Sequence, residues 1–344
     1  MTPYETLPSR AFWRTAVASR NPLAIEDLWS PKWDIGPDTA FATAGSCFAQ
    51  HIGSALRRRG HAWVNAEPAP TCMPESIRPT FGYDLFSFRT GNVYTASQLR
   101  QWLDWSADPG TVPTEIWTGA GRFYDPFRPS IEPNGFRSPD ELERSRRSLL
   151  RAIADAAAQA DVFIFTLGLT ECWRNMEAGY EYHTCPGVVA GAFDKQRYRF
   201  HNQTFHEIKL DLIHVLSALR RINPRIRLLL TVSPVPLTAT ASAQHVLVAT
   251  SHSKSVLRAV AGELSASYEY VDYFPSYEII STSPFRGMFF DPNMRTVSRF
   301  GVDVVMSHLF AKMAPPPTVP SPAPNARPAD PLCDDAALEN FARR

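Results

Sequence analysis

The sequence is poor in cysteine, in excess charge of either sign and in long apolar runs. Its 344 residues include five cysteines, and 35 basic residues stand against 34 acidic ones for a formal net charge of +1. The cysteines are odd in number, scattered and without a CxxC pair. We therefore expect neither a zinc site nor a disulfide framework, and we expect a reducing compartment. The balanced charge gives no electrostatic reason to expect nucleic acid or an anionic membrane as a partner.

Targeting and membrane-spanning signals are also missing. The opening residues 1–4 show no basic stretch followed by an apolar run, so no secretory signal is predicted. No segment approaches the roughly 20 apolar residues of a membrane span. No glycine-rich loop suited to cradling phosphates occurs, so we expect no nucleotide cofactor, and no metal is implied. These observations predict a cytoplasmic chain, and they leave its oligomeric state open.

What the sequence does contain is enough apolar material, 44% of its residues, for one large core. Residues 1–38 carry Trp13, Trp29 and Trp33, and a disordered tail would be poor in aromatics, so we expect this arm to pack on the core. Residues 39–313 are expected to form the main domain. Residues 314–344 begin with a proline-rich run and are expected to be a flexible tail without a catalytic part.

Apolar runs and helical patterns alternate through the main domain. The alternation predicts an α/β fold with a doubly wound, mostly parallel sheet. One helix start is marked especially well, because Ser138-Pro139-Asp140-Glu141 combines a cap residue, a proline and an acid. The expected strands are 40–44, 161–167, 227–232 and 268–273, and the expected helices are 50–59, 138–159, 205–221, 242–265 with a possible break at 250–253, and 302–312.

The most informative stretch is Thr43-Ala44-Gly45-Ser46-Cys47-Phe48-Ala49-Gln50, between an expected strand and an expected helix. Ser46 fits two interpretations. It is a favoured residue for capping a helix. It is also placed as a serine nucleophile would be, exposed at a sheet edge and close to helix N–H groups that can stabilise an anion.

Three other loops are expected at the same edge of the sheet. Ligands of open α/β sheets bind beyond the carboxyl ends of the strands, and residues 168–173 and 233–238 each follow a strand. Residues 91–95 form a turn before another helix. Each loop also has a plain structural interpretation, as a turn, a helix start or a stiff proline-containing connection.

Residues 45–49 read Gly-Ser-Cys-Phe-Ala, and in this the chain resembles the GSCFA family, a distant branch of the SGNH (GDSL-like) hydrolase and acyltransferase group. The resemblance runs from about residue 41 to 310. It implies a flavodoxin-like three-layer α/β/α fold and a hydrolase or O-acyltransferase acting on acyl esters. An ester of a sugar or glycan is one substrate that the resemblance suggests. Further matching stretches occur in order at 91–95, 166–173, 231–236, 253–258, 273–278 and 295–306.

The resemblance also implies roles for individual residues. Ser46 falls at the nucleophile, whose position also contributes to the oxyanion hole. Gly91 falls near the glycine whose N–H helps to form that hole. Thr170 falls where the third oxyanion donor is usually an asparagine.

The fourth motif of the group departs from the pattern. Asp291 is followed three residues later by Met294, where the group carries a histidine. The base must then come from elsewhere, and we favour His245, because its helix is expected to begin at the catalytic edge. Glu171 could orient that histidine or act as the base itself. His183 and His252 are the alternatives.

Two further possibilities stay open. Cys47 could replace Ser46 as the nucleophile, because a helix N-terminus lowers a thiol pKa, or it could be a core residue. The missing histidine also fits a non-catalytic binding module for an acylated or glycosyl ligand. The remaining candidates for substrate contacts are Asn92, Trp173, Ser233, His183, His252, Lys254, Asp291 and Arg295.

Overall fold

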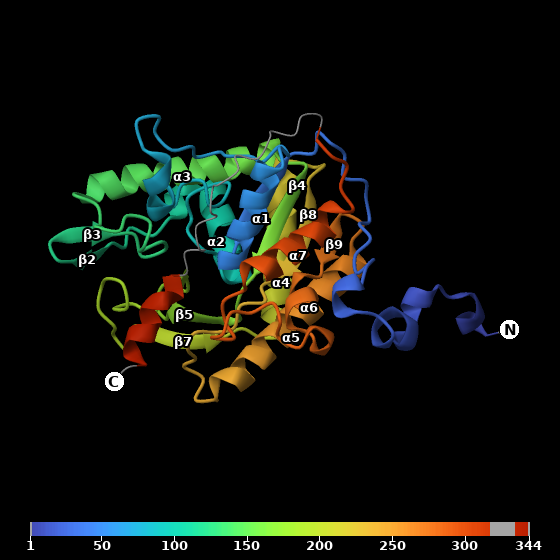
Figure 1. Cartoon of the computed structure of the whole chain (residues 1–344). Coiled ribbons are helices and arrows are strands. Elements are labelled where there is room, and N and C mark those ends of the chain that lie inside the picture. The colour runs from blue at the N-terminus through green and yellow to red at the C-terminus, as the bar shows by residue number, and fades with distance from the viewer. Residues whose placement is uncertain (1, 317–333, 343–344) are drawn as a thin grey trace.

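A computed structural model describes residues 2–316 and 334–342, and a four-stranded parallel sheet lies at its centre (Figure 1). Residues 62–64 run beside the first strand, where the Phe41 N–H donates to Ala62 O over 2.7 Å and the Val64 N–H donates to Phe41 O over 2.8 Å. If this segment is counted as the second strand along the chain, the five parallel strands lie in the order 2-1-3-4-5 by their sequence positions. This order is flavodoxin-like. The strands lie in the order β1 (Phe41–Gly45), β4 (Val162–Leu167), β8 (Arg227–Val232) and β9 (Val271–Phe274).

These strands form because their sequences are apolar on both faces. Every residue of β1, β4 and β9 is buried, and β8 is buried except at Arg227. Continuous burial is typical of parallel strands that are covered on both sides. β9 begins three residues later than the sequence predicts, because Tyr268 ends the preceding helix and its N–H donates to Leu264 O.

Helices cover both faces of the sheet and give three layers, α/β/α. Two separate hydrophobic clusters fill the spaces between the layers, one on each face. The α/β class with a mostly parallel sheet is thus confirmed. On one face lie α1 (Cys47–Arg58), α6 (Ser276–Ser281) and α7 (Arg299–Phe310), and on the other α2 (Ala96–Ala107), α3 (Pro139–Gln159), α4 (Phe205–Ile222) and α5 (Val246–Ser267).

The break predicted at residues 250–253 does not occur, because α5 is continuous. The Ser251 hydroxyl donates to Leu247 O within the helix over 3.1 Å, and Ser253 is bonded to another element. A serine hydroxyl bonded to the carbonyl four residues earlier bends a helix more often than it breaks it. No described helix has the length and apolar content needed to cross a bilayer.

A small antiparallel sheet, which the sequence did not indicate, follows β4 directly and lies beyond the end of the main sheet (Figure 1). Its strands, in the order β6-β5-β7, are β5 (Glu171–Asn175), β6 (Glu181–Tyr182) and β7 (Tyr198–Asn202), and a separate hairpin joins β2 (Trp117–Gly119) to β3 (Arg122–Tyr124). Short 3-10 segments occupy Pro3–Thr6, Ser9–Ala11, Pro22–Ala24, Glu75–Ile77, Pro79–Phe81, Pro109–Thr111, Ser283–Phe285 and Asp334–Phe341, and Arg14–Ala18 is a π-helical turn.

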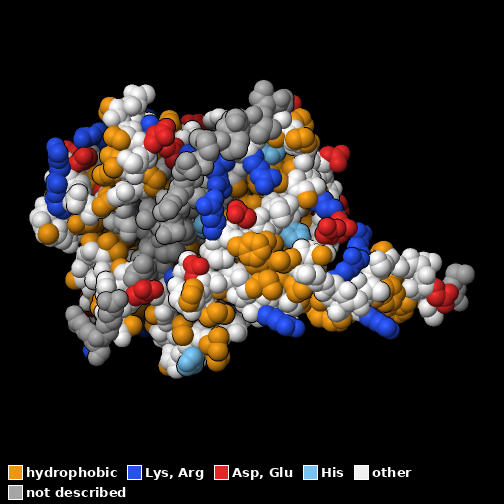
Figure 2. All heavy atoms as spheres, in the orientation of Figure 1, with side chains coloured by type: hydrophobic (Ala, Val, Ile, Leu, Met, Phe, Trp, Pro, Cys, Tyr) orange, Lys and Arg blue, Asp and Glu red, His pale blue; other side chains and the backbone are white. Residues whose placement is uncertain are grey.

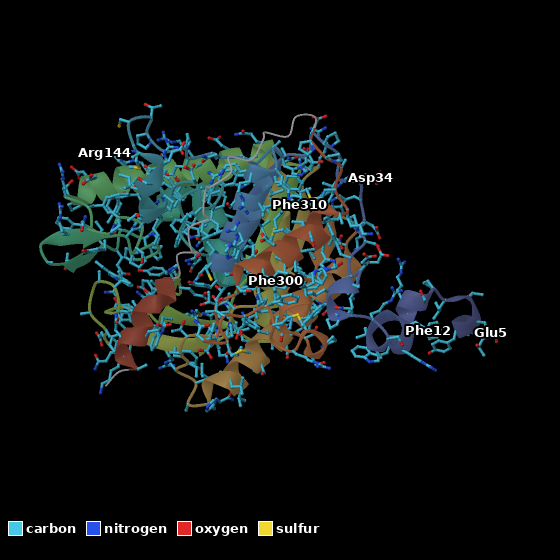
Figure 3. All side chains as sticks on the ribbon, viewed as in Figure 1. Glu5, Phe12, Asp34, Arg144, Phe300 and Phe310 are labelled. Carbon is cyan, nitrogen blue, oxygen red and sulfur yellow. The ribbon has the colours of Figure 1, made fainter. Side chains whose placement is uncertain are left out.

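The aromatic residues of the N-terminal arm divide into two groups. Trp29 and Trp33 are buried, and the Trp29 indole N–H donates to the Asp272 carboxylate over 3.2 Å. Trp13 is 67% exposed, on a segment that projects from the body together with Phe12 (Figures 1 and 3). Hydrophobic side chains are visible on the surface of that segment (Figure 2). Most of the predicted tail, 317–333 and 343–344, lies outside the described residues.

Candidate active site

The crevice between the ends of β1 and β4 brings Ser46 close to the central strand. Gly45 pairs with Thr166, and the Ser46 N–H donates to Thr166 O over 3.0 Å. Gly45 has φ +138°, and a Cβ there would lie 2.5 Å from Thr166 O. Only glycine allows this approach, so the Gly-Ser order is required by the contact with β4. The chain turns into α1 directly after it.

The Ser46 side chain does not do what a helix cap does. Ser46 stands at the N-cap position of α1, yet its hydroxyl makes no cap hydrogen bond. The residue is 2% exposed, and no atom of residues 2–316 or 334–342 bonds to its Oγ. Buried polar atoms are nearly always paired, so a buried hydroxyl in this state needs an explanation other than helix capping.

The turn at residues 91–94 lies against both sides of the same crevice. The Val93 N–H donates to Gly45 O over 2.8 Å, and Tyr94 O accepts from the Gly168 N–H over 2.9 Å. Gly91 adopts φ +70°, and no described residue accepts a hydrogen bond from its N–H. These contacts hold the 91–94 turn against Gly45 and Gly168, the residues on either side of the Ser46 position.

Gln50 holds the amide of Asn92 in this turn. Its Nε2 donates to Asn92 Oδ1 over 2.9 Å, and both side chains are buried. Gln50 lies four residues after Ser46, so both are on one face of α1. Gln50 was not predicted from the sequence. The available signal was a glutamine one turn after the serine, directly following the apolar run Cys47-Phe48-Ala49.

The turn after β4 packs directly on Ser46. A Cβ at Gly168 would lie 3.0 Å from Ser46 Cβ and 2.9 Å from Tyr94 Cδ1, so Gly168 allows a close approach of all three residues. Lys254, only 1% exposed, donates from Nζ to Gly168 O over 2.7 Å. Lys254 lies two helical turns into α5, so a buried lysine holds the segment after β4 in place. From the sequence, Lys254 was expected only as a substrate contact.

The two other predicted oxyanion donors are engaged within the protein. The Thr170 N–H donates to Ser253 Oγ over 3.1 Å, and its hydroxyl donates to Asn202 Oδ1 over 2.6 Å. The Ser46 N–H is bonded to Thr166 O. Among the three predicted positions, only Gly91 presents an N–H without a partner in the described chain.

His245 does not lie beside Ser46, because α5 begins well outside the sheet edge. Ser253 contacts the turn after β4, and His245 stands eight residues earlier, about 12 Å farther along the helix axis. His245 is exposed, and its Nδ1 accepts the Leu247 N–H over 3.2 Å. The expectation that this helix begins at the catalytic edge is therefore not met. Its first turn projects beyond that edge.

Glu171 of β5 and His252 of α5 lie near each other. Glu171 begins β5, and its Oε1 accepts the Thr240 hydroxyl over 2.7 Å. Burial raises the pKa of the Glu171 carboxyl, while the Thr240 bond and the nearby His252 act in the opposite direction. His252 is exposed. One of the two carboxylate oxygens of Glu171 is thus bonded to Thr240.

His183 is the histidine that lies on the Ser46 side. It follows β6, and its ring packs against Tyr94 with centroids 5.3 Å apart. Tyr94 and Ser46 both contact the position of Gly168. His183 also lines a cavity of about 430 Å³ together with Gln50, Gly91 and Asn92.

The other predicted contacts are spread along the edge. Trp173 packs edge-on against Phe193 and Phe200. Ser233 follows β8, and its hydroxyl accepts the Val235 N–H over 3.3 Å. The loop before α7 carries Asp291, whose N–H donates to Thr296 O over 2.9 Å, and Arg295, which donates to the Thr238 hydroxyl.

Three of the described cysteines, Cys47, Cys172 and Cys185, do not offer a better nucleophile. Cys47 is the first residue of α1 and is 3% exposed, in the core. Burial raises the pKa of Cys172 well above its usual range and raises the pKa of Cys185 to about 11. The described part of the chain holds no group of three or more His, Cys, Asp or Glu residues suited to a metal ion.

Comparison with known proteins gives a family and two distant structural likenesses. No curated protein matches the sequence. An acetyl esterase, crystallised as a serine-to-alanine mutant with an acetate ion, is 10% identical, with a TM-score of 0.32 over 80% of this chain and 95% of that one. A carbohydrate esterase family 3 protein from Talaromyces cellulolyticus is also 10% identical, with a TM-score of 0.35 over the same shares. Such TM-scores assign no activity to this chain. The sequence matches the GSCFA family over residues 40–309, and the chain belongs to that family.

Proposed function

We propose that this protein is a serine enzyme of acyl-ester chemistry, a hydrolase or an O-acyltransferase, acting on an ester of a small molecule or a glycan. The observation that carries the proposal is the Ser46 hydroxyl. It is buried at the carboxyl ends of β1 and β4, makes no cap bond and has no partner in the described chain. Ligands of this sheet order bind at that crevice. Membership of the GSCFA family supports the same chemistry.

The turn at 91–92 supplies the oxyanion donors in this proposal. The Gly91 N–H has no acceptor among the described residues. Gln50 binds Asn92 Oδ1, which directs the two N–H groups of Asn92 Nδ2 away from Gln50. A preorganised donor of this kind contributes on the order of a hundred-fold to a thousand-fold in rate.

His183 is the base in this proposal, in place of His245. It shares the cavity with Gly91 and Asn92 and packs on Tyr94, which contacts the same glycine position as Ser46. His245 is exposed and lies beyond the sheet edge. Catalytic hydrogen bonds often tighten only when substrate is bound, so the nucleophile and base need not be bonded in the free enzyme.

The reaction then follows from these positions. Ser46 Oγ attacks the ester carbonyl carbon while His183 accepts its proton, and the carbonyl oxygen becomes an anion facing Gly91 and Asn92. When the anion collapses, the bond to the alcohol breaks and the alcohol leaves with the proton from His183. Water or a second alcohol attacks the acyl-enzyme in the same way and restores Ser46.

Labelling with a fluorophosphonate tests the nucleophile. We expect the wild-type protein to be labelled, Ser46→Ala to be unlabelled, and Ser138→Ala to be labelled like the wild type. Ser138 is a suitable control because it also stands at a helix N-cap, and there its hydroxyl does accept a backbone N–H, from Glu141. Equal labelling of the Ser46→Ala variant would refute the proposal.

One observation favours a second candidate, a binding module without turnover. No histidine of the described chain is bonded to Ser46 Oγ, and the donors of Thr170 are engaged within the protein. A binding module would take up an acylated or glycosyl ligand at a stoichiometry of one. It would neither turn over p-nitrophenyl esters nor react with the fluorophosphonate.

A further inference from the structure

We propose that the cavity beside the Gly91–Asn92 turn holds the acyl chain of the ester, and that this chain is a medium-length alkyl group such as octanoyl. The inference rests on the proposed function and adds the class of acyl group. The cavity has a volume of about 430 Å³. A water molecule takes up about 30 Å³ of liquid, so the cavity has room for on the order of ten heavy atoms. An acetyl group would leave most of it unfilled.

The walls of the cavity are mainly apolar. They come from the 3-10 turn Pro79–Phe81 and the segment after it, from residues 128–133, from the loop that follows His183 and from Ala337 of the 3-10 segment Asp334–Phe341. Apolar walls of this kind favour burial of a hydrocarbon by about 25 cal/mol per Å² of apolar surface. The side chains that form them include Leu85, Phe86, Ile131, Pro133, Val188 and Val189.

The charge inside the cavity is already neutralised. Among the described lining residues only Arg128 is charged. Its side chain is fully buried and donates to the Asp125 carboxylate over 2.9 Å, to Arg89 O over 2.9 Å and to Ser145 Oγ over 3.0 Å. Its guanidinium is therefore committed to holding the loop, and it does not serve as a receptor for a phosphate or carboxylate.

The polar lining residues are placed where an ester group would need them. Gln50 and Asn92 are bonded to each other beside Gly91, and His183 packs on Tyr94. Ile131 also lines the cavity and lies against Gly82, where an added Cβ would meet its Cδ1. An ester with its carbonyl at the Gly91 turn could place its alkyl chain among these apolar side chains. The other polar side chains of the lining are Thr80, Ser130 and Arg128, whose guanidinium is already bonded within the protein.

A chain-length series tests the inference through turnover. We expect kcat/KM for p-nitrophenyl octanoate to exceed that for the acetate by tenfold or more. Val189→Trp fills the cavity and should lower this octanoate-to-acetate ratio at least tenfold. Val248→Trp is the matched control, because Val248 is 55% exposed on the first turn of α5, and it should leave the ratio unchanged. A preference for acetate, or an equal ratio in both variants, would overturn the inference.

A second measurement is independent of catalysis and separates this inference from the proposed function. Octanoate should raise the melting temperature of the Ser46→Ala variant by mass action, and Val189→Trp should remove the shift. Octanoate binding without ester turnover would sustain the acyl pocket and refute the enzyme. Ser46-dependent turnover of the acetate, without an octanoate shift, would sustain the enzyme and refute the acyl pocket. Absence of both effects refutes both.

Discussion

Ser46 and Ser138 both stand immediately before a helix, but the two helix starts are held in different ways. At α3, the Ser138 hydroxyl accepts the Glu141 N–H over 3.2 Å, with Pro139 and Asp140 between them. At α1, the Ser46 hydroxyl makes no such bond, and the first turn has no acidic residue. The start of α3 is stabilised by residues next to it in the chain, and the start of α1 is not.

The start of α1 is held by distant parts of the chain instead. Thr166 accepts the Ser46 N–H, and Gly168 packs on the Ser46 side chain while Lys254 binds the Gly168 carbonyl. These contacts leave the serine hydroxyl out of the stabilising bonds. The difference teaches that a hydroxyl at a helix start is available for chemistry when other elements have taken over its structural role.

The largest effect should appear in the reaction itself. Ser46→Ala is expected to lower turnover of the preferred ester by a thousand-fold or more, and His183→Ala by a similar factor, because members of one catalytic unit act together. The double variant should be no slower than either single variant. Steady-state kinetics check this, with His245→Ala and His252→Ala as controls. If His245→Ala is the slow variant, the base is His245 and the proposed role of His183 is wrong.

Lys254→Met tests whether distant contacts hold the start of α1. The substitution leaves the buried Gly168 carbonyl without its donor, and we expect the free energy of unfolding to fall by about 1–3 kcal/mol. Urea unfolding measures this. Lys209→Met is the control, because Lys209 forms an ion pair with Glu263 that is about one third exposed, and such pairs are worth about 0–1 kcal/mol. Equal losses in the two variants would contradict the assigned role of Lys254.

Removing each serine in turn compares the two helix starts directly. Ser138→Ala should lower the free energy of unfolding by about 1 kcal/mol, the usual cost of a lost cap. Ser46→Ala should change it by less than about 0.5 kcal/mol, because no cap bond is lost. Urea unfolding of both variants on the same day provides the measurement. A larger loss for Ser46→Ala than for Ser138→Ala would show that Ser46 is structural.

The smallest effect concerns α4, a third helix start, where Thr204 and Glu207 form a reciprocal cap. Burial acts to raise the pKa of Glu207, but bonds from Thr204 and the nearby His201 and Arg174 outweigh it and hold the pKa at about 2. Because the ordinary value is 4.5, this stabilisation is fully present above about pH 4.5 and is lost as the pH falls toward 2.

Glu207→Gln should therefore be less stable than the wild type at neutral pH, and the gap should close in acid. The effect is small because the Glu207 side chain is 33% exposed and solvent screens its partners. Urea unfolding at several pH values between 7 and 3 measures the gap. Glu143→Gln, in an exposed ion pair on α3, serves as the control and should show little difference at any pH. A gap that widens in acid would contradict the assigned pKa.

Local signals in the sequence were sufficient for most of the main sheet. The run at 227–232 is a strand at the predicted bounds, and the helix predicted at 138–159 begins at Pro139 behind its cap. Both depend on neighbours in the chain, whose chemistry is visible in the sequence. The position of Ser46 at the carboxyl end of β1 was predictable for the same reason, because the end of a buried strand can be recognised from neighbouring residues.

The partners of the site residues depend on contacts between distant segments. Thr170 is bonded to Ser253, 83 residues away, and Lys254 reaches Gly168 across 86 residues. His245 was favoured on where its helix was expected to begin relative to the sheet, and that relation depends on how α5 packs on β8 and β9. The small sheet was missed partly for the same reason: β5 and β6 are joined by a short turn, but β5 pairs with β7 across a long intervening segment.

The attachment of the arm to Asp272 has a consequence for the outermost strand, β9. A strand at the border of a sheet can recruit a strand from another molecule, and proteins resist this by covering the border. The Asp272 carboxylate accepts both the Trp29 indole N–H and the Lys32 N–H, each over 3.2 Å, and Trp29 packs on Phe274. Figure 1 shows the arm running beside β9. We therefore expect a chain that begins at residue 34 to lose these contacts beside β9 and to self-associate, which size-exclusion chromatography would detect.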